Sequence, residues 1–119
     1  MPINALIVDD DRAFRRVVRR LLEQAGDISV VGEAGDGEEA VELTQQLQPD
    51  VVLMDVAMPR VDGFEATRRI KAKRPQTKVI ILTVHEEAVY RRAAGGSGAD
   101  NFLIKKTLAT KLLPAIIEQ

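Results

Sequence analysis

The chain has 119 residues, of which 45% are hydrophobic and 29% charged, and its net charge is −1. This length corresponds to one domain of ordinary globular composition, and the acidic balance argues against direct binding of nucleic acid. The absence of cysteine excludes disulfides, thiolate catalysis and cysteine-ligated zinc. No apolar run approaches the ~18 residues of a membrane span, and no signal peptide is recognisable, so we expect a cytoplasmic protein without membrane contact.

The first predicted strand, residues 5–8, is a continuous apolar run that ends in three adjacent aspartates: Asp9, Asp10 and Asp11. Adjacent carboxylates repel one another unless a cation lies near them. One of them can cap the next helix, but a cap needs a single acid and leaves two unexplained. A hard divalent cation such as Mg²⁺ (or Mn²⁺) accounts for the excess, because it binds through a few carboxylates and keeps part of its water.

An amphipathic helix is predicted over residues 12–25, with Gly26 as its C-cap. Its apolar side chains recur at helical spacing and are expected to face the core: Phe14, Val17, Val18, Leu21, Leu22 and Ala25. The other face carries four arginines: Arg15, Arg16, Arg19 and Arg20. We interpret the arginines as a solvated face, and a partner-docking surface is the alternative.

A second strand is predicted over residues 28–34, and residues 35–40 then match the dinucleotide-binding pattern G-x-G-x-x-A. We reject that interpretation because the segment follows the second strand rather than the first. Its acids would also repel a pyrophosphate: Asp36, Glu38 and Glu39. They favour a helix start instead, so a helix is predicted over residues 37–47. Its inner face is expected to carry Ala40, Leu43, Thr44 and Leu47.

The third predicted strand, residues 51–54, is wholly apolar, as expected of a strand buried on both faces of a parallel sheet. It ends in Asp55, and turns are predicted at residues 58–59 and 62–63. Open α/β sheets bind ligands at the carboxyl ends of their strands, where a buried acid is costly unless a charged group meets it. Alternatively, Asp55 only caps the next turn.

The second half of the chain continues the alternation of strands and helices. Strands are predicted over residues 79–82 and 101–104, followed by Thr83 and by Lys105 respectively. Helices are predicted over residues 64–73 and 86–94, and the second is expected to fray where glycines crowd its end: Gly95, Gly96 and Gly98. A last helix between Leu108 and Ile117 contains Pro114, so it is either kinked or starts late, near Thr110. Five strand–helix units predict an α/β fold with a five-stranded parallel sheet, five helices on both faces and right-handed crossovers.

The residues just past the strands form a pattern of their own: Asp9, Asp10, Asp55, Thr83 and Lys105. In a parallel sheet these ends share one edge, so acids, a hydroxyl and an ammonium are expected to converge. Three acids and one lysine leave a deficit of positive charge that one divalent cation would fill. Asp55 can then act as a nucleophile toward phosphorus, while the metal and Lys105 neutralise the phosphoryl oxygens and Thr83 donates a hydrogen bond. The product would be an aspartyl phosphate.

At this point the chain resembles the receiver domain of two-component response regulators, over nearly all of residues 1–119. The motifs that carry the resemblance are residues 8–10 (Val-Asp-Asp), 53–59 (Leu-Met-Asp-Val-Ala-Met-Pro), 62–63 (Asp-Gly), 81–83 (Ile-Leu-Thr) and 98–105 (Gly-Ala-Asp-Asn-Phe-Leu-Ile-Lys). The resemblance implies a flavodoxin-like (CheY-like) fold with Asp55 as phosphoacceptor. The metal ligands that it implies are Asp10, Asp55 and the backbone carbonyl of Ala57, with Asp9 helping through water. Thr83 and Phe102 would be the switch pair.

The resemblance also implies partners. The phosphate donor would be a sensor histidine kinase or a small acyl phosphate. Residues 28–83 look most like regulators with a C-terminal helix-turn-helix (LuxR-type) domain, so transcription would be regulated, and DNA bound, only through an output domain absent from this chain. A homodimer would form through helix 86–94, strand 101–104 and the last helix, or through the first and last helices.

Four residues depart from the family's usual pattern. Val84 replaces a small residue and is expected to narrow access to the phosphoryl group. His85 lies where residues tend to tune dephosphorylation; we interpret it as a solvated loop histidine, and contact with the phosphate is the alternative. Lys106 replaces a frequent proline, which argues against a cis bond there. Phe102 has no hydroxyl, so its movement would be governed by packing alone.

Three other functions share part of this pattern. A stand-alone single-domain regulator is the first, and an inert α/β module used only for protein contacts is the second. An aspartyl-phosphate phosphatase is the third, but such enzymes need a second acid two residues after the nucleophile, where this chain has Ala57. We therefore expect a phosphoacceptor that assists its own phosphoryl transfer rather than an enzyme.

Overall fold

Five segments form one parallel sheet in the computed structural model, which describes residues 2–117. The strands are β1 (Ile3–Val8), β2 (Ile28–Ala34), β3 (Val51–Met54), β4 (Lys78–Thr83) and β5 (Asn101–Ile104). Their order is β2-β1-β3-β4-β5, and every neighbouring pair is parallel. The buried parts of the three central strands are continuous apolar runs, as expected where helices cover both faces of the sheet. The predicted α/β fold with a parallel sheet is therefore confirmed.

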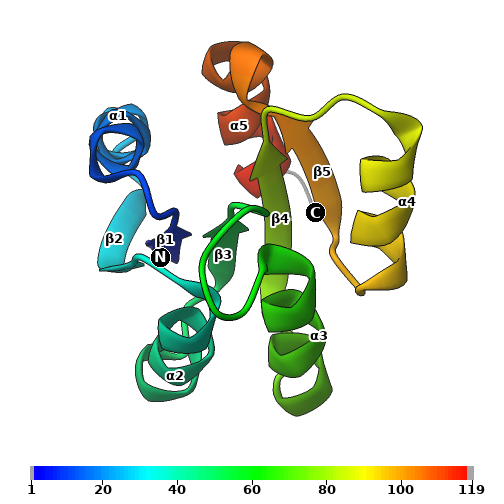
Figure 1. Cartoon of the computed structure of the whole chain (residues 1–119). Helices are drawn as coiled ribbons and strands as arrows, with labels where there is room; N and C mark the ends of the chain where they lie inside the picture. The colour runs from blue at the N-terminus through cyan, green and yellow to red at the C-terminus, as the bar shows by residue number, and fades with distance from the viewer. Residues whose placement is uncertain (1, 118–119) are drawn as a thin grey trace.

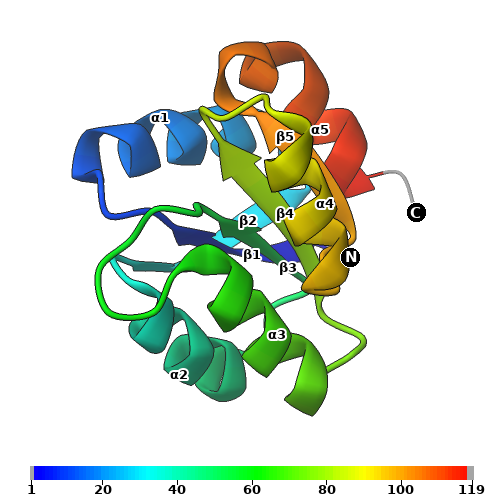
Figure 2. The same cartoon turned by 45° about the vertical axis from the view of Figure 1, so that its right-hand side comes forward.

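Helices cover the sheet in two layers (Figure 1, Figure 2). They are α1 (Arg12–Glu23), α2 (Gly37–Leu47), α3 (Gly63–Lys73), α4 (Ala88–Gly96) and α5 (Leu108–Ile117). Helices α1 and α5 bury one face, in a core that contains Leu22, Leu53 and Leu112. Helices α2, α3 and α4 bury the other face, in a core that contains Ile70 and Ile81. Because all five strands are parallel, every connection from a strand to the helix that follows it lies at the same edge of the sheet, the carboxyl edge.

Aspartates cap the first three helices, each directly after a strand or its loop. The Asp11 carboxylate accepts hydrogen bonds from the backbone amides of Ala13 and Phe14. Asp36 and Asp62 do the same for the amides of the residues three positions on. A cap of this kind stabilises a helix by about 1 kcal/mol. Of the three adjacent acids, Asp11 is thus the cap, and the cap does not account for Asp9 and Asp10.

Helix α1 differs from the prediction in its end and in its exposed side chains. It ends at Glu23 rather than Ala25, and Gly26 lies beyond the C-cap Gln24 with a φ of 78°. Val17 is 55% exposed, because the apolar stripe is wider than the face that meets the sheet. Leu47 of α2 is likewise exposed rather than on the inner face. The assignment of these two residues to the core was wrong.

The last third of the chain also departs from the prediction. Helix α4 starts at Ala88 rather than Glu86 and continues through Gly96, so Gly95 and Gly96 lie inside its last turn and Gly98 lies beyond it; the fraying of that turn stays a prediction. A short 3-10 turn, η1 (Lys105–Thr107), precedes α5, which begins at Leu108 with Pro114 inside it. A late start near Thr110 was therefore wrong. None of the helices within residues 2–117 has the length and apolarity that a membrane crossing requires.

Candidate functional site

Three carboxylates lie together at the carboxyl edge of the sheet. Asp9 and Asp10 follow β1 and Asp55 follows β3, which is the neighbouring strand. Backbone hydrogen bonds hold both turns: the Asp55 amide donates to the Val8 carbonyl at 2.9 Å, and the Asp9 amide donates to the Ala34 carbonyl at 3.0 Å. One ligand oxygen from each carboxylate lies within 4.8 Å of the others. The convergence predicted from the strand ends is present for these three acids.

Lys105 brings a positive charge to the same place from the far side of the sheet. It follows β5, and its long side chain passes the end of β4 to reach the acids. Its Nζ lies 2.7 Å from Asp9 Oδ2 and 3.3 Å from Asp55 Oδ1. The ring of Phe14 contacts the same ammonium, with its centroid 4.1 Å from Nζ. Phe14 was predicted only as a core residue, and no sequence pattern signals a cation–π contact between residues so far apart.

Burial governs the protonation of Asp55. Desolvation and then the charge of Asp9 raise the pKa of Asp55 to about 6, although Lys105 opposes both. The pKa of Lys105 is raised in turn: burial lowers it, but the hydrogen bond to Asp9 and the charge of Asp55 outweigh that. Because pH 7 lies above this pKa, Asp55 is mostly an ionised carboxylate at neutral pH, which is the nucleophilic form. A bound cation would favour that form further.

The chemistry of the donors that remain suits a hard divalent cation. Asp9 already uses both carboxylate oxygens, Oδ1 toward the Asp11 amide at 2.9 Å and Oδ2 toward Lys105. Asp10 is exposed, and within residues 2–117 neither its carboxylate nor the Ala57 carbonyl oxygen has a hydrogen-bond partner. The Asp10 and Asp55 carboxylates, which lie together, are oxygen ligands of the kind that Mg²⁺ and Mn²⁺ prefer, and the Ala57 carbonyl as a further ligand stays a prediction. The residues present fit the predicted metal, with Asp9 held back by its other bonds.

Thr83 and Phe102 lie on one face of the sheet, which is the face that α4 covers. Phe102 pairs with Ile81, two residues before Thr83, so the alternation of a strand places both side chains on the same side. The Thr83 hydroxyl accepts a hydrogen bond from the His85 amide at 3.2 Å. Phe102 is only 7% exposed, and the Arg91 guanidinium lies 4.7 Å from its ring centroid. In this structure the phenyl ring already occupies a buried position.

The positions that depart from the receiver pattern have contacts of their own. The His85 ring stacks on Tyr90 of α4, with centroids 4.2 Å apart and an interplanar angle of 5°. Val84 is exposed, so its bulk faces solvent rather than the core. Lys106 pairs with Glu86 at 2.8 Å, and residues 2–117 contain no cis peptide bond, in agreement with the expectation for Lys106. His85 thus lies in the loop before α4 with its side chain 37% exposed, as expected of a loop histidine, and its ring is held in place by the stacking contact.

Two glycines allow helices to approach the loop that follows β3. A Cβ at Gly63 would lie 1.9 Å from the Asp55 carbonyl oxygen, and one at Gly37 would lie 2.1 Å from the Val61 carbonyl oxygen. Neither clash can be relieved by moving a flexible side chain, because both atoms belong to the backbone. The sequence indicated a turn at Gly63, but not that the glycine is required by the loop carrying Asp55 and Ala57.

Comparisons with known proteins agree with this geometry. The sequence matches the family described as the response regulator receiver domain over residues 5–117. It is 40% identical to the transcriptional regulatory protein DegU of Brevibacillus brevis over 96% of this chain and 48% of that protein. It is 41% identical to the response regulator protein VraR of Staphylococcus saprophyticus over 98% of this chain and 56% of that protein. The chain therefore spans about half the length of these curated relatives.

Solved structures give the same answer for the fold. The response regulator domain of Thermotoga maritima CheB superposes with a TM-score of 0.91 at 35% identity, covering 98% of this chain and 94% of that one. A LuxR-family two-component response regulator from Aurantimonas sp. SI85-9A1 gives a TM-score of 0.93 at 33% identity, covering 98% and 83%. The CheY-like fold and the likeness to LuxR-type regulators are both confirmed. The chain belongs to the family of response regulator receiver domains.

Proposed function

We propose that residues 1–119 are one phospho-accepting receiver domain, phosphorylated on Asp55, that regulates transcription through an output domain outside this chain. The observation that carries the proposal is the meeting of Asp9, Asp10, Asp55 and Lys105 at one edge of the sheet. The names of the relatives, which include transcriptional regulators about twice as long, support the output. A cytoplasmic location is part of the same proposal.

Mg²⁺ (or Mn²⁺) is the cofactor that the site suits. Asp10, Asp55 and the Ala57 carbonyl would hold the ion, and Asp9 would assist through water. When bound, the ion supplies positive charge that balances the three carboxylates and the phosphoryl oxygens. Lys105 alone cannot do this, because one ammonium faces three acids.

Phosphoryl transfer needs one nucleophile and a site that accepts charge. An Asp55 carboxylate oxygen forms a bond to phosphorus while the phosphorus–nitrogen bond of a kinase phosphohistidine, or the phosphorus–oxygen bond of an acyl phosphate, breaks. The departing imidazole or carboxylate keeps the bonding pair. Lys105 then shifts its contact toward a phosphoryl oxygen, and the Thr83 hydroxyl donates a hydrogen bond to another. The partner implied is a sensor histidine kinase.

The consequence for the fold is a switch between two arrangements of the α4 side. Phosphorylation adds a charge of about −1.5 to −2 beside Thr83 and Lys105. Drawing Thr83 toward the phosphate costs its bond from the His85 amide, and Phe102 lies on the same face, where it can follow. The surface of α4, β5 and α5, or that of α1 and α5, would then pair with a second copy.

Mass spectrometry tests the phosphorylation. The protein is incubated with an acyl phosphate and Mg²⁺, digested, and the modified residue is located; the expected result is one phosphoryl group on Asp55. Asp55→Asn is the matched variant, because it keeps the shape and removes the nucleophile, and it should gain none. Phosphate still present on Asp55→Asn, or absent from the wild type, would defeat the proposal. Turnover of a phosphate ester would revive the phosphatase alternative.

A further inference from the structure

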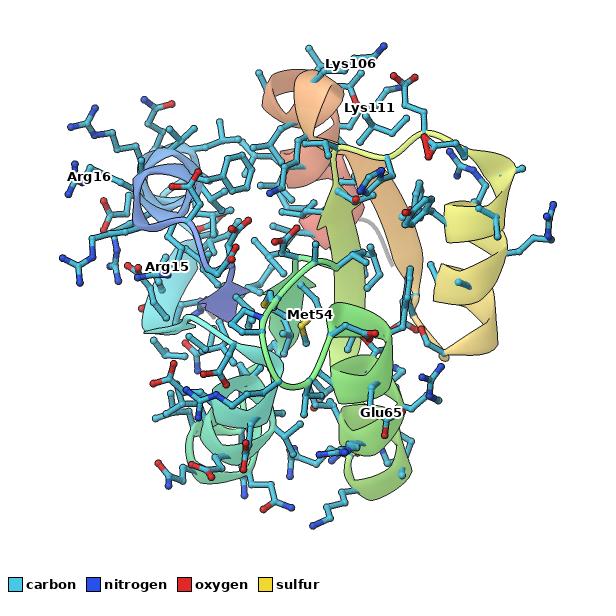
Figure 3. The ribbon with its side chains drawn as sticks, viewed as in Figure 1. Arg15, Arg16, Met54, Glu65, Lys106 and Lys111 are labelled. Atoms are coloured by element: carbon cyan, nitrogen blue, oxygen red, sulfur yellow. The ribbon has the colours of Figure 1, made fainter. Side chains whose placement is uncertain are left out.

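Arg15, near the start of α1, joins the acidic loop to β2. Its Nε donates to Glu33 Oε1 at 2.8 Å, and its Nη1 donates to the backbone carbonyl oxygen of Asp9 at 2.5 Å. The side chain is 14% exposed. In Figure 3 it lies against β2, whereas the neighbouring Arg16 points away from the molecule. The expectation that these arginines form only a solvated face was therefore wrong for Arg15.

Arg19 provides an internal comparison one turn along the same helix. Its Nε donates to the other oxygen of Glu33 at 2.7 Å, and it also pairs with Glu23. Although burial raises it, the hydrogen bonds from Arg19 and Arg15 hold the pKa of Glu33 below its ordinary value, so Glu33 anchors both guanidinium groups. Only Arg15 also contacts the acidic loop, through its hydrogen bond to the Asp9 carbonyl.

That carbonyl belongs to the peptide unit between Asp9 and Asp10. The Asp9 amide is held by β2 through the Ala34 carbonyl, and the Asp9 carboxylate is held by Asp11 and Lys105. Arg15 closes the set by binding the remaining polar group of Asp9. A peptide unit is planar, so fixing its carbonyl fixes the direction in which the backbone of Asp10 leaves it. The rigid guanidinium fork holds the carbonyl at a set place relative to Glu33, which is built into β2 opposite Ile7.

We propose that Arg15 is a positioning residue for the divalent-cation site. It orients the Asp9–Asp10 peptide so that the Asp10 carboxylate converges with that of Asp55. Arg15 does not touch the ion or the phosphoryl group in this scheme. The inference rests on the proposed function, because it assigns a role toward the metal that the function requires.

Charge alone predicts the opposite effect, which makes the proposal testable. Arg15 is a cation near three carboxylates and repels Mg²⁺, so its removal would by Coulomb's law alone make the site bind Mg²⁺ more tightly. Loss of orientation makes the site bind Mg²⁺ more weakly, since groups that orient metal ligands are typically worth tenfold or more in affinity. The sign of the change therefore distinguishes the two.

The experiment titrates Mg²⁺ alone into the full chain by isothermal calorimetry, comparing Arg15→Met with Arg19→Met. Both variants lose one positive charge and leave Glu33 with one arginine. We expect Arg15→Met to bind Mg²⁺ roughly tenfold more weakly than Arg19→Met, although the two melting temperatures fall by similar amounts. Equal affinities, or tighter binding by Arg15→Met, would overturn the proposal.

Arg15→Lys keeps the test decisive if Arg15→Met does not fold. It retains the charge but replaces the planar fork by one ammonium on a shorter reach, so it should also weaken Mg²⁺ binding; wild-type affinity would contradict the proposal. Phosphorylation of the wild type separates the two claims. Phosphate on Asp55 with equal affinities in the two methionine variants defeats the role of Arg15 alone. Weakened binding in Arg15→Met with no phosphate on wild-type Asp55 defeats the proposed function and leaves the positioning role intact.

Discussion

A lysine pairs with an aspartate at each edge of the sheet. At one edge the two charges balance each other, and at the other edge negative charge is left over. At the amino edge, Lys71 Nζ donates to Asp100 Oδ2 and the Thr77 carbonyl at 2.8 Å and to the Pro75 carbonyl at 3.2 Å. The same Asp100 oxygen also accepts the Val79 amide at 2.8 Å. One charge meets one charge, and every donor of the ammonium has an acceptor. This cluster joins α3, β4 and the start of β5.

At the carboxyl edge the same kind of pair is left unbalanced. Lys105 meets Asp9 and Asp55, while Asp10 stays without a partner among residues 2–117. Burial is the main cause of the raised pKa of Asp55, and the negative charge of Asp9 raises it further. A saturated cluster stabilises the fold, whereas the unsaturated one is where we propose that a cation and a phosphoryl group bind. The contrast predicts that equivalent substitutions at the two edges will have different consequences.

Lys105→Met should have the largest effect of the substitutions that distinguish the two edges. It removes the ammonium that receives charge during transfer, so we expect phosphorylation of Asp55 by an acyl phosphate to slow by about a hundredfold, the loss typical of one such donor. The rate is measured by mass spectrometry against time at saturating Mg²⁺. Lys71→Met is the control and should keep the wild-type rate within about twofold. Equal slowing of both would mean that the two lysines have the same role.

Lys71→Met should instead lower stability. It leaves Asp100 with one hydrogen bond fewer and removes the donor of two backbone carbonyls, so the free energy of unfolding should fall by about 2 kcal/mol. Urea unfolding followed by circular dichroism gives the value. A loss below about 0.5 kcal/mol would mean that solvent replaces the lysine without cost.

Asp55→Asn should raise stability at neutral pH. The pKa of folded Asp55 is about 6, above its ordinary 3.8, so its contribution to stability is present below pH 3.8 and is lost as pH rises through 6. At pH 7 with a chelator, removing the buried charge should therefore raise the free energy of unfolding by about 1 kcal/mol, allowing for the lost contact with Lys105. The gain should disappear below pH 4. A variant that is less stable than the wild type at pH 7 contradicts this account.

The smallest effect is expected from Lys106→Ala. Lys106 pairs with Glu86 on the surface next to Lys105, but both side chains are largely exposed. Solvent screens such a pair, so stability should change by less than about 0.5 kcal/mol and phosphorylation should be unaffected. A clear loss of phosphorylation would extend the functional cluster one residue beyond Lys105.

Sequence patterns predicted the elements well where burial imposes a simple period. All five strands were predicted, although β1 begins two residues earlier than expected and β4 is one residue longer at each end, because an apolar run between helices in such a chain forms a strand of the parallel sheet. Topology alone placed Asp9, Asp10, Asp55 and Lys105 together. Helix ends were less accurate: α1 ends two residues earlier than predicted, and α4 both begins and ends two residues later. Val17 was misplaced because helical periodicity gives a direction but not the width of the buried face.

The sequence by itself determined the order of the elements and which side chains stand at the strand ends, since both depend on local patterns of apolar and polar residues. Only the tertiary structure decided which of those side chains already have hydrogen-bond or ion-pair partners within the protein and which can still bind a ligand. Asp9 is occupied by Lys105, 96 positions away, and Arg15 is drawn from solvent by Glu33 on another strand. Such pairings depend on distances between elements that meet only in the folded chain, and no local pattern encodes them.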